Sequence, residues 1–189
     1  MKAIAIFFVL ALSVALLSSA QAADKYTVDA IHSAVQFKVA HKGAGFTHGR
    51  FNQFEGSILI DKKNIAKSSI DLTIKAASVD TGFEKREQHL KSPDFLNAKQ
   101  FPVIHFKSTK IKPTGPKTAD IEGDFTLLGV TRKITAKATL TGNPTGLIGL
   151  EANAVIKRSE FGNKFGLEML GDEVFIYIAV EGGLSDDNA

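Results

Sequence analysis

The sequence contains no cysteine among its 189 residues. This absence excludes disulfide bonds and thiolate metal ligands, so the fold depends on burial and hydrogen bonding alone. Long apolar runs are also missing after residue 22, where no segment approaches the ~20 apolar residues that a membrane-spanning helix needs. The residues from 23 onward are enough for a single domain with a sizeable core or an internal cavity.

Recognisable catalytic motifs are absent as well. The sequence has no G-x-S-x-G nucleophile elbow and no G-x-x-x-x-G-K-[ST] phosphate loop. Its five histidines lack the spacing of a metal site such as H-E-x-x-H, although two of them would meet if they faced each other across a hairpin, namely His41 and His48. We therefore expect no enzymatic activity, no bound metal and no cofactor.

Charge of one sign is not concentrated anywhere in the chain. The 23 Lys and Arg and the 20 Asp and Glu are interspersed along its length. Nucleic-acid-binding domains instead gather basic residues on one face, where they follow a phosphate backbone. The nearly even balance therefore argues against a nucleic-acid partner.

The first 22 residues have the pattern of a cleaved secretory signal peptide. Lys2 precedes the apolar run AIAIFFVLALSVALL, and Ala20 and Ala22 occupy the small-residue positions of an A-x-A cleavage site. A membrane anchor is the alternative, but the apolar run is shorter than a spanning helix requires. We predict cleavage before Ala23 and a periplasmic location, which suits an exported chain without disulfides.

Alternation of polar and apolar residues dominates the rest of the chain. In SAVQFKVAH, Val35, Phe37 and Val39 fall on one face and Gln36 and Lys38 on the other, which is the period of a half-buried strand. The same period predicts eight strands, at 33–41, 54–61, 69–78, 103–111, 119–127, 133–141, 147–157 and 173–181. Eight antiparallel strands form a sandwich or a closed barrel, and the length of these strands favours a barrel.

The segment between the third and fourth predicted strands interrupts this pattern. Residues 84–91, EKREQHLK, are strong helix formers, and Ser92 with Pro93 is expected to begin a second short helix. Pro102 then favours extended backbone for the next strand. The insertion either packs against the outside of the barrel or closes one of its ends with four apolar residues turned inward: Leu90, Phe95, Leu96 and Phe101.

Small side chains predict space inside the barrel. Counting an antiparallel register across the TGNPTG turn pairs Ala138 with Leu150 and Ala136 with Ala152, so two adjacent strands share an alanine-rich patch. An eight-stranded barrel has a lumen just wide enough for its own side chains or for one slender ligand. A patch that faces inward leaves room for a ligand. The alternative is a tightly packed core, filled by the phenylalanines of the strands.

Four ordered blocks cover nearly the whole chain after residue 22: YTVDAIHSAVQFKVAHKG, GRFNQFEGSI, ASVDTGFEKREQHLKSPDFLNAKQFPVIHFKST and IEGDFTLLGVTRKIT. Together they are similar to the YceI family of polyisoprenoid-binding periplasmic proteins, and Arg158 to Gly162 keep that family's Arg-Ser-x-Phe-Gly step. The resemblance implies an all-β fold, an eight-stranded antiparallel lipocalin-like barrel with a short helical insertion between strands 3 and 4. With the signal-peptide pattern and the polar C-terminal residues, we divide the chain into a signal peptide (1–22), a lipid-binding β-barrel domain (23–182) and a flexible C-terminal tail (183–189).

The resemblance also implies a partner, a long isoprenoid or another long-chain amphiphilic lipid held in the lumen. We predict that the protein carries or sequesters this lipid without covalent chemistry. The lipid tail is expected to lie along thirteen residues, the last two near the barrel ends: Phe37, Val39, Phe54, Ile58, Leu72, Ile74, Phe106, Phe125, Ala136, Ala152, Ile176, Phe95 and Phe165.

Two other functions stay open at this point. One is an enzyme that acts on a lipid-like substrate through polar residues at the barrel mouth, namely His41, Arg86, His89 and His105. The other is an interaction protein whose barrel is packed and admits no ligand. The sequence also leaves open whether the chain forms a homodimer.

Overall fold

A computed structural model describes residues 23–142 and 146–185 of the chain. This part holds ten β-strands and one α-helix, α1 (Glu84–Lys91). The strands are β1 (Asp24–His41), β2 (Gly45–Phe51), β3 (Phe54–Ile60), β4 (Ser69–Lys75), β5 (Val79–Asp80), β6 (Val103–Pro113), β7 (Thr118–Leu127), β8 (Val130–Gly142), β9 (Ile148–Lys157) and β10 (Leu170–Leu184). Short 3-10 helices lie at Ile65–Lys67, Ala76–Ser78 and Arg158–Phe161.

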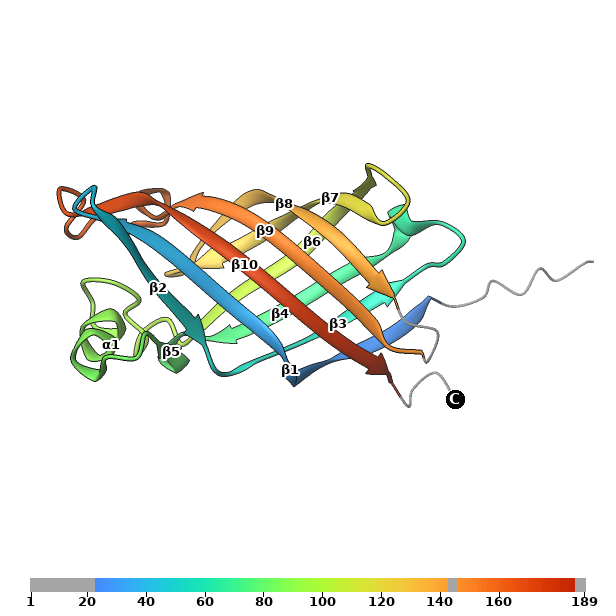
Figure 1. The fold of residues 1–189 in the computed structure, drawn as a ribbon, viewed down its shortest axis with the longest axis horizontal. Coiled ribbons are helices and arrows are strands. Elements are labelled where there is room, and N and C mark those ends of the chain that lie inside the picture. Colours follow the sequence, from blue (N-terminus) through green and yellow to red (C-terminus); the bar gives the residue numbers. More distant parts are fainter. Residues whose placement is uncertain (1–22, 143–145, 186–189) are drawn as a thin grey trace, which may run out of the picture.

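The strands form one closed antiparallel sheet (Figure 1). The sheet order runs from β10 through β9, β8, β7, β6, β4 and β3 to β1, and β1 pairs with β10 to close the ring. β3 and β2 pair with the two halves of β1, and β4 and β5 pair in turn with β3 and β2. β2 and β3 share one position around the barrel, and β4 and β5 share the next. The ten strands therefore occupy eight positions, which we call staves. The expected eight-stranded barrel is confirmed, with α1 between the third and fourth staves.

Alternation along each strand fills the interior with apolar side chains. In β7, Ile121, Phe125 and Leu127 are buried, while the acidic residues Glu122 and Asp124 lie between them on the other face. The inward side chains form two clusters. One includes residues near the β3–β4 connection, and the other reaches the end of the barrel where α1 lies.

Two N-terminal stretches depart from the predicted strands. β1 starts at Asp24 rather than at residue 33. Its pairing with β10 shifts register between Asp29 and Ala34. A bulge of this kind breaks the alternation on which the prediction depended. β2 occupies a polar, glycine-rich stretch that lacks a run of β-branched residues. Pairing with β1 holds it in the sheet, and local periodicity does not reveal such pairing.

The predicted register between β8 and β9 is wrong by two residues. Ala138 pairs with Ala152 rather than with Leu150, and the last pair of the ladder is Gly142 with Ile148. The connection is therefore centred one residue further along the chain than the count assumed. Because side chains alternate with a period of two, this shift leaves every residue on its expected face. The alanines still point inward.

The helical insertion contains one helix where two were expected. α1 matches residues 84–91, but Ser92 lies at the C-terminal end of α1 instead of beginning a second helix. The N–H of Asn97 donates to the Ser92 carbonyl at 2.8 Å, and Asn97 adopts a left-handed φ of 43°. The chain from 92 to 100 therefore folds into successive turns.

The turns after α1, rather than α1 itself, supply the buried residues at this end of the barrel. α1 has no buried residue, whereas Phe95 and Ala98 are buried. Phe101 was expected to face inward, but it covers Gly129 in the β7–β8 turn. Gly129 has a positive φ of 73° and no side chain, so the Phe101 ring can lie directly against its backbone.

The C-terminal strand extends into the predicted tail. β10 ends at Leu184, and the Ser185 N–H donates to the Lys25 carbonyl at 2.8 Å. The predicted signal peptide and residues 186–189 lie outside the described residues. Across 23–142 and 146–185, no helix combines the length and the apolar character needed to cross a membrane.

A carboxylate ties β5 to β2 and gives a pH prediction. Asp80 accepts hydrogen bonds from the Asn52 amide at 3.0 Å, the Gly82 N–H at 2.9 Å and the Arg50 guanidinium at 2.9 Å. These bonds, with Asn52 first, lower the pKa of Asp80 from 3.8 to about 2. The contact therefore stabilises the fold fully above pH 3.8 and is lost as the pH falls through about 2.

We expect the Asn52→Ala substitution to raise the pKa of Asp80, measured by following the side-chain carboxyl carbon in NMR. Gln53→Ala serves as the control, because the Gln53 side chain makes no hydrogen bond to Asp80 among the described residues. An Asp80 titration that is the same in both variants would contradict the assignment.

Candidate binding cavity in the barrel lumen

An apolar cavity of about 180 Å³ runs through the barrel lumen. Its wall includes residues of every stave, from Ile121 and Val180 at one end to Leu90, Phe95 and Leu96 at the end near α1. A single water needs only about 10–15 Å³, but it also needs two to four polar partners. A cavity of roughly 150 Å³ lined by Leu, Ile and Phe stays dry and takes up apolar molecules. This lumen is therefore suited to an apolar ligand.

Eleven of the thirteen residues predicted to contact a lipid tail line this cavity. They are Phe37, Val39, Ile58, Leu72, Ile74, Phe95, Phe106, Phe125, Ala136, Ala152 and Ile176. Phe54 is half-buried and packs against the cluster at the α1 end without lining the cavity. Phe165 lies outside it, at the barrel end. That any of these residues contacts a ligand stays a prediction.

Two glycines keep phenylalanine rings flat against the wall. Gly49 pairs with Phe37 across β1 and β2, and a Cβ at Gly49 would overlap the Phe37 ring. Gly123 in β7 lies under the Phe106 ring of β6 in the same way. Each of these two rings takes the space of a missing side chain, so Phe37 and Phe106 lie beside the cavity without filling it.

Replacing Gly123 with Ala is therefore expected to destabilise the barrel. The added methyl group would meet both the Phe106 ring and the Lys107 carbonyl, and overpacking of this kind costs about 1 to 3 kcal/mol. Urea unfolding would measure the loss. Gly183→Ala is the matched control, because no atom lies within 4 Å of the position that its Cβ would take. Equal stability of the two variants would contradict the role given to Gly123.

Three aromatic rings close the lumen at the α1 end. Phe95 is buried and lines the cavity, His89 comes from α1, and Phe165 comes from the β9–β10 connection. Their ring centroids lie 4.9 Å (His89 and Phe95), 5.3 Å (His89 and Phe165) and 5.2 Å (Phe95 and Phe165) apart in edge-to-face arrangements. We call these three residues the aromatic plug. His89 also bonds to Asp94 at 2.9 Å.

A buried arginine fixes the β9–β10 connection beside the plug. Arg158 donates to the carbonyls of Phe165 (2.7 Å), Gly171 (2.9 Å) and Leu170 (3.0 Å) and to Asn163 Oδ1 (2.8 Å). Burial lowers the pKa of Arg158. The Asn163 amide in turn donates to the Phe95 carbonyl at 3.3 Å, which links the connection to the plug.

The sequence analysis identified Arg158 only as the first residue of the Arg-Ser-x-Phe-Gly step and gave it no partner. Its acceptors are mostly backbone carbonyls, which leave no trace in the residue types of the sequence. The available signal for a structural role was an arginine at the start of a short polar stretch that contains glycines.

The polar residues proposed for catalysis do not come together. His105 lies on the outer wall, where Nε2 bonds to Asp71 at 2.7 Å and lowers the pKa of Asp71. Arg86 donates to the Thr81 carbonyl at 2.7 Å, and His89 belongs to the plug. His41 ends β1 and is exposed. No hydrogen bond joins any two of these four residues in the described ranges.

His41 and His48 do not meet across the β1–β2 hairpin. His48 pairs with Lys38, and His41 pairs with Gly45, so the two histidines are three positions apart along the ladder. An odd separation places them on opposite faces of the sheet.

The described residues contain one group of side chains with metal-ligand chemistry, which the sequence did not reveal. Ligand atoms of Asp29, His32 and Glu181 lie within 4.8 Å of one another on the outside of the barrel, next to the β1 bulge. His32 Nδ1 bonds to Asp29 at 2.8 Å, which raises the pKa of His32 and lowers that of Asp29. None of these three residues lines the lumen cavity.

Comparisons with known proteins agree with this architecture. The family model described as a YceI-like domain matches residues 26–182. The Escherichia coli O157:H7 protein YceI is 40% identical over 170 residues, which are 87% of this chain and 88% of that protein. The crystal structure of Burkholderia cenocepacia BcnA has a TM-score of 0.77 and 26% identity, and the match covers 82% of this chain and 98% of that chain.

A third similar structure comes from Saccharophagus degradans. It is described as a polyisoprenoid binding domain implicated in plant cell wall breakdown. Its TM-score is 0.71 at 17% identity, and the match covers 85% of this chain and 98% of that chain. This likeness concerns the fold.

Proposed function

Because the chain belongs to the YceI family, we propose that it binds a long isoprenoid or a similarly slender amphiphilic lipid in its lumen and carries or sequesters that lipid in the periplasm. The single observation that carries the proposal is the apolar cavity enclosed by all eight staves. The description of the S. degradans domain as polyisoprenoid binding agrees with this ligand class.

The cavity favours a ligand that is one chain wide. Its volume of about 180 Å³ is below the ~300–1,000 Å³ of pockets for compact drug-sized ligands. Burial of each five-carbon isoprene unit contributes roughly 3 to 4 kcal/mol. A few units therefore suffice for tight binding, even after the costs of ordering the chain. A longer chain extends to the α1 end, where its headgroup lies outside the lumen and the aromatic plug shifts to admit it.

Binding without covalent chemistry is part of the proposal. The lumen wall is formed almost entirely by aliphatic and aromatic side chains, and the histidines proposed for catalysis are scattered over the outer wall, the hairpin and the plug. Among the described residues that line the cavity, no nucleophile and base therefore form a pair facing the lipid. Turnover of a lipid substrate with a bell-shaped pH profile would favour the enzyme instead.

Native mass spectrometry tests the ligand. Protein purified from its own periplasmic fraction, before and after solvent extraction, should lose a mass that lipid analysis assigns to an unchanged isoprenoid or related amphiphile. Recovery of no lipid, together with no stabilisation by any member of an isoprenoid panel, would overturn the proposal and favour a barrel that admits no ligand.

The location has its own test. Cleavage before Ala23 predicts that N-terminal sequencing of the exported protein reads Ala-Asp-Lys-Tyr. Protein that keeps residues 1–22 and stays in the membrane fraction would overturn the periplasmic assignment.

A further inference from the structure

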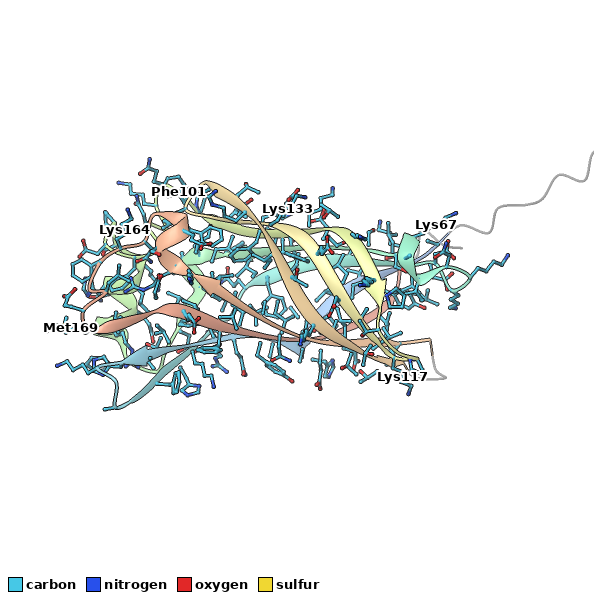
Figure 2. All side chains as sticks on the ribbon, turned by 90° about the horizontal axis from the view of Figure 1, so that it is seen from above. Lys67, Phe101, Lys117, Lys133, Lys164 and Met169 are labelled. Atoms are coloured by element: carbon cyan, nitrogen blue, oxygen red, sulfur yellow. The ribbon has the colours of Figure 1, made fainter. Side chains whose placement is uncertain are left out.

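Large apolar side chains are exposed at the loop tips beside the aromatic plug. In the β9–β10 connection, Phe165, Leu167 and Met169 keep 43%, 40% and 44% of their surface exposed, and Phe46 of the β1–β2 hairpin keeps 50%. At the opposite end, the connections 61–68 and 114–117 carry no exposed large apolar side chain, and the described part of the β8–β9 connection, residues 146–147, carries one, Leu147 at 38%. Figure 2 shows Met169 and Lys164 at one end of the barrel and Lys67 and Lys117 at the other.

The β1–β2 hairpin and the β9–β10 connection are adjacent, and the Phe46 ring lies edge to face with Phe175 of β10 at 6.0 Å. The Lys42 N–H at the hairpin tip donates to the Met169 carbonyl at 2.6 Å, and His41 pairs with Leu170. Phe165 contacts the plug residues His89 and Phe95, so these adjacent loops continue to the lumen. We call the following residues the loop-tip patch: Lys42, Phe46, Lys164, Phe165, Leu167 and Met169.

The surroundings of the patch fit a lipid bilayer better than a rigid protein partner. Its apolar residues Phe165, Leu167 and Met169 lie on a connection at the end of the barrel, where exposed apolar side chains can enter the interface between headgroups and acyl chains. Two lysines flank the apolar residues, against a single acidic residue within 164–169, Glu168. Lysines next to an inserting apolar patch favour anionic lipid headgroups.

We propose that the loop-tip patch docks the barrel on an anionic bilayer, with the plugged end of the lumen facing the membrane. The inference rests on the proposed function, because a lipid that passes between bilayer and lumen at this end avoids exposure of its chain to water. Docking places Phe165, and through it Phe95, where an entering chain first meets the protein.

Vesicle flotation tests the docking. The purified protein should float with vesicles of phosphatidylethanolamine and phosphatidylglycerol, and less with vesicles of phosphatidylcholine alone. The double variant Leu167→Ser with Met169→Ser should partition about tenfold or more weakly, since two partly exposed apolar side chains no longer enter the interface. Ile31→Ser with Val155→Ser is the matched control, because it removes exposed apolar side chains away from the patch and should float like the wild type.

Several outcomes would overturn the docking. These are no flotation of the wild type, equal loss in both double variants, and loss only when Lys62 and Lys63 at the opposite end become Gln. A wild-type dimer without vesicles that the Leu167 and Met169 changes dissociate would assign the patch to a second copy of the chain instead. Thermal unfolding of each variant must match that of the wild type. If the double variant unfolds, the Phe46→Ser substitution in the hairpin repeats the flotation test.

A lumen variant separates this inference from the proposed function. Ala152→Phe blocks the cavity but leaves the loop tips intact, so it should float normally while it takes up no isoprenoid from detergent solution. Normal isoprenoid uptake without flotation would remove the docking and keep the lumen ligand. Flotation of wild-type protein that takes up no isoprenoid would keep a membrane-bound barrel and remove the lumen ligand.

Discussion

Replacing Ala136 with Phe is expected to abolish lipid uptake while the barrel stays folded. Ala136 lines the cavity on β8, and a phenyl ring there would occupy space that the ligand needs. Displacing a single five-carbon unit from the lumen removes roughly 3 to 4 kcal/mol, which weakens binding a hundredfold or more. The ring enters an existing cavity, so we expect the free energy of unfolding of the lipid-free protein to change by less than about 1 kcal/mol.

Two neighbours on the same strand complete this experiment. Thr135→Phe places the ring on the outer face and should leave uptake unchanged. Ala138→Phe places it at a buried position that does not line the cavity, where overpacking should cost about 1 to 3 kcal/mol. Isoprenoid uptake and thermal unfolding of delipidated proteins measure both effects. Equal uptake by Ala136→Phe and the wild type would show that the ligand does not lie along β8.

Replacing Arg158 with Met is expected to destabilise the protein by about 3 kcal/mol. The substitution removes four hydrogen bonds of 3.0 Å or shorter and a fifth of 3.5 Å to the Asn163 carbonyl, and bonds from a charged donor contribute roughly 1.5 to 3 kcal/mol each. Relief from the cost of burying the guanidinium offsets part of that loss, as do waters that reach the freed carbonyls. Urea unfolding of the purified protein would measure the change.

Arg158→Lys separates charge from geometry. A lysine keeps the positive charge but lacks the planar fork that reaches carbonyls on both sides of the connection, so we expect it to recover less than half of the loss. The control is Arg132→Met, since Arg132 is exposed and, within the described part of the chain, makes one long bond of 3.3 Å to the Glu160 carbonyl. If Arg158→Met were no more destabilising than Arg132→Met, the buried arginine would not hold the β9–β10 connection in place.

Local periodicity predicted most of the barrel because most strands have one solvent-exposed face and one buried face. The segment around Val35, Phe37 and Val39 shows this alternation, and all three residues line the lumen. The same reasoning could not find β2, whose polar side chains follow no such pattern. What holds β2 in place is its ladder with β1, which depends on residues distant from its own sequence.

The lumen was predictable in kind but not in detail. The alanines of β8 and β9 indicated free space, and the two-residue error in register did no harm because it preserved their face. The flattening of Phe37 onto Gly49 was not visible, since it requires a specific pair across two strands. The sequence analysis placed His89, Phe95 and Phe165 near the barrel ends but did not predict that their rings contact one another. They belong to separate segments that only tertiary folding brings together.

The closure of the ring has a consequence for how the chain reaches its native state. β1 and β10 are the first and the last strands, and their ladder joins Tyr26 to Leu184, so nearly the whole chain must be present before the sheet can close. Contacts between residues so distant in sequence slow folding, because the entropy of the intervening loop is lost before the contacts form. Until closure, β1 and β10 each present an open edge that can pair with another chain. Aggregation during folding should therefore begin at these two strands, and a truncation within β10 should expose both β1 and β9 permanently.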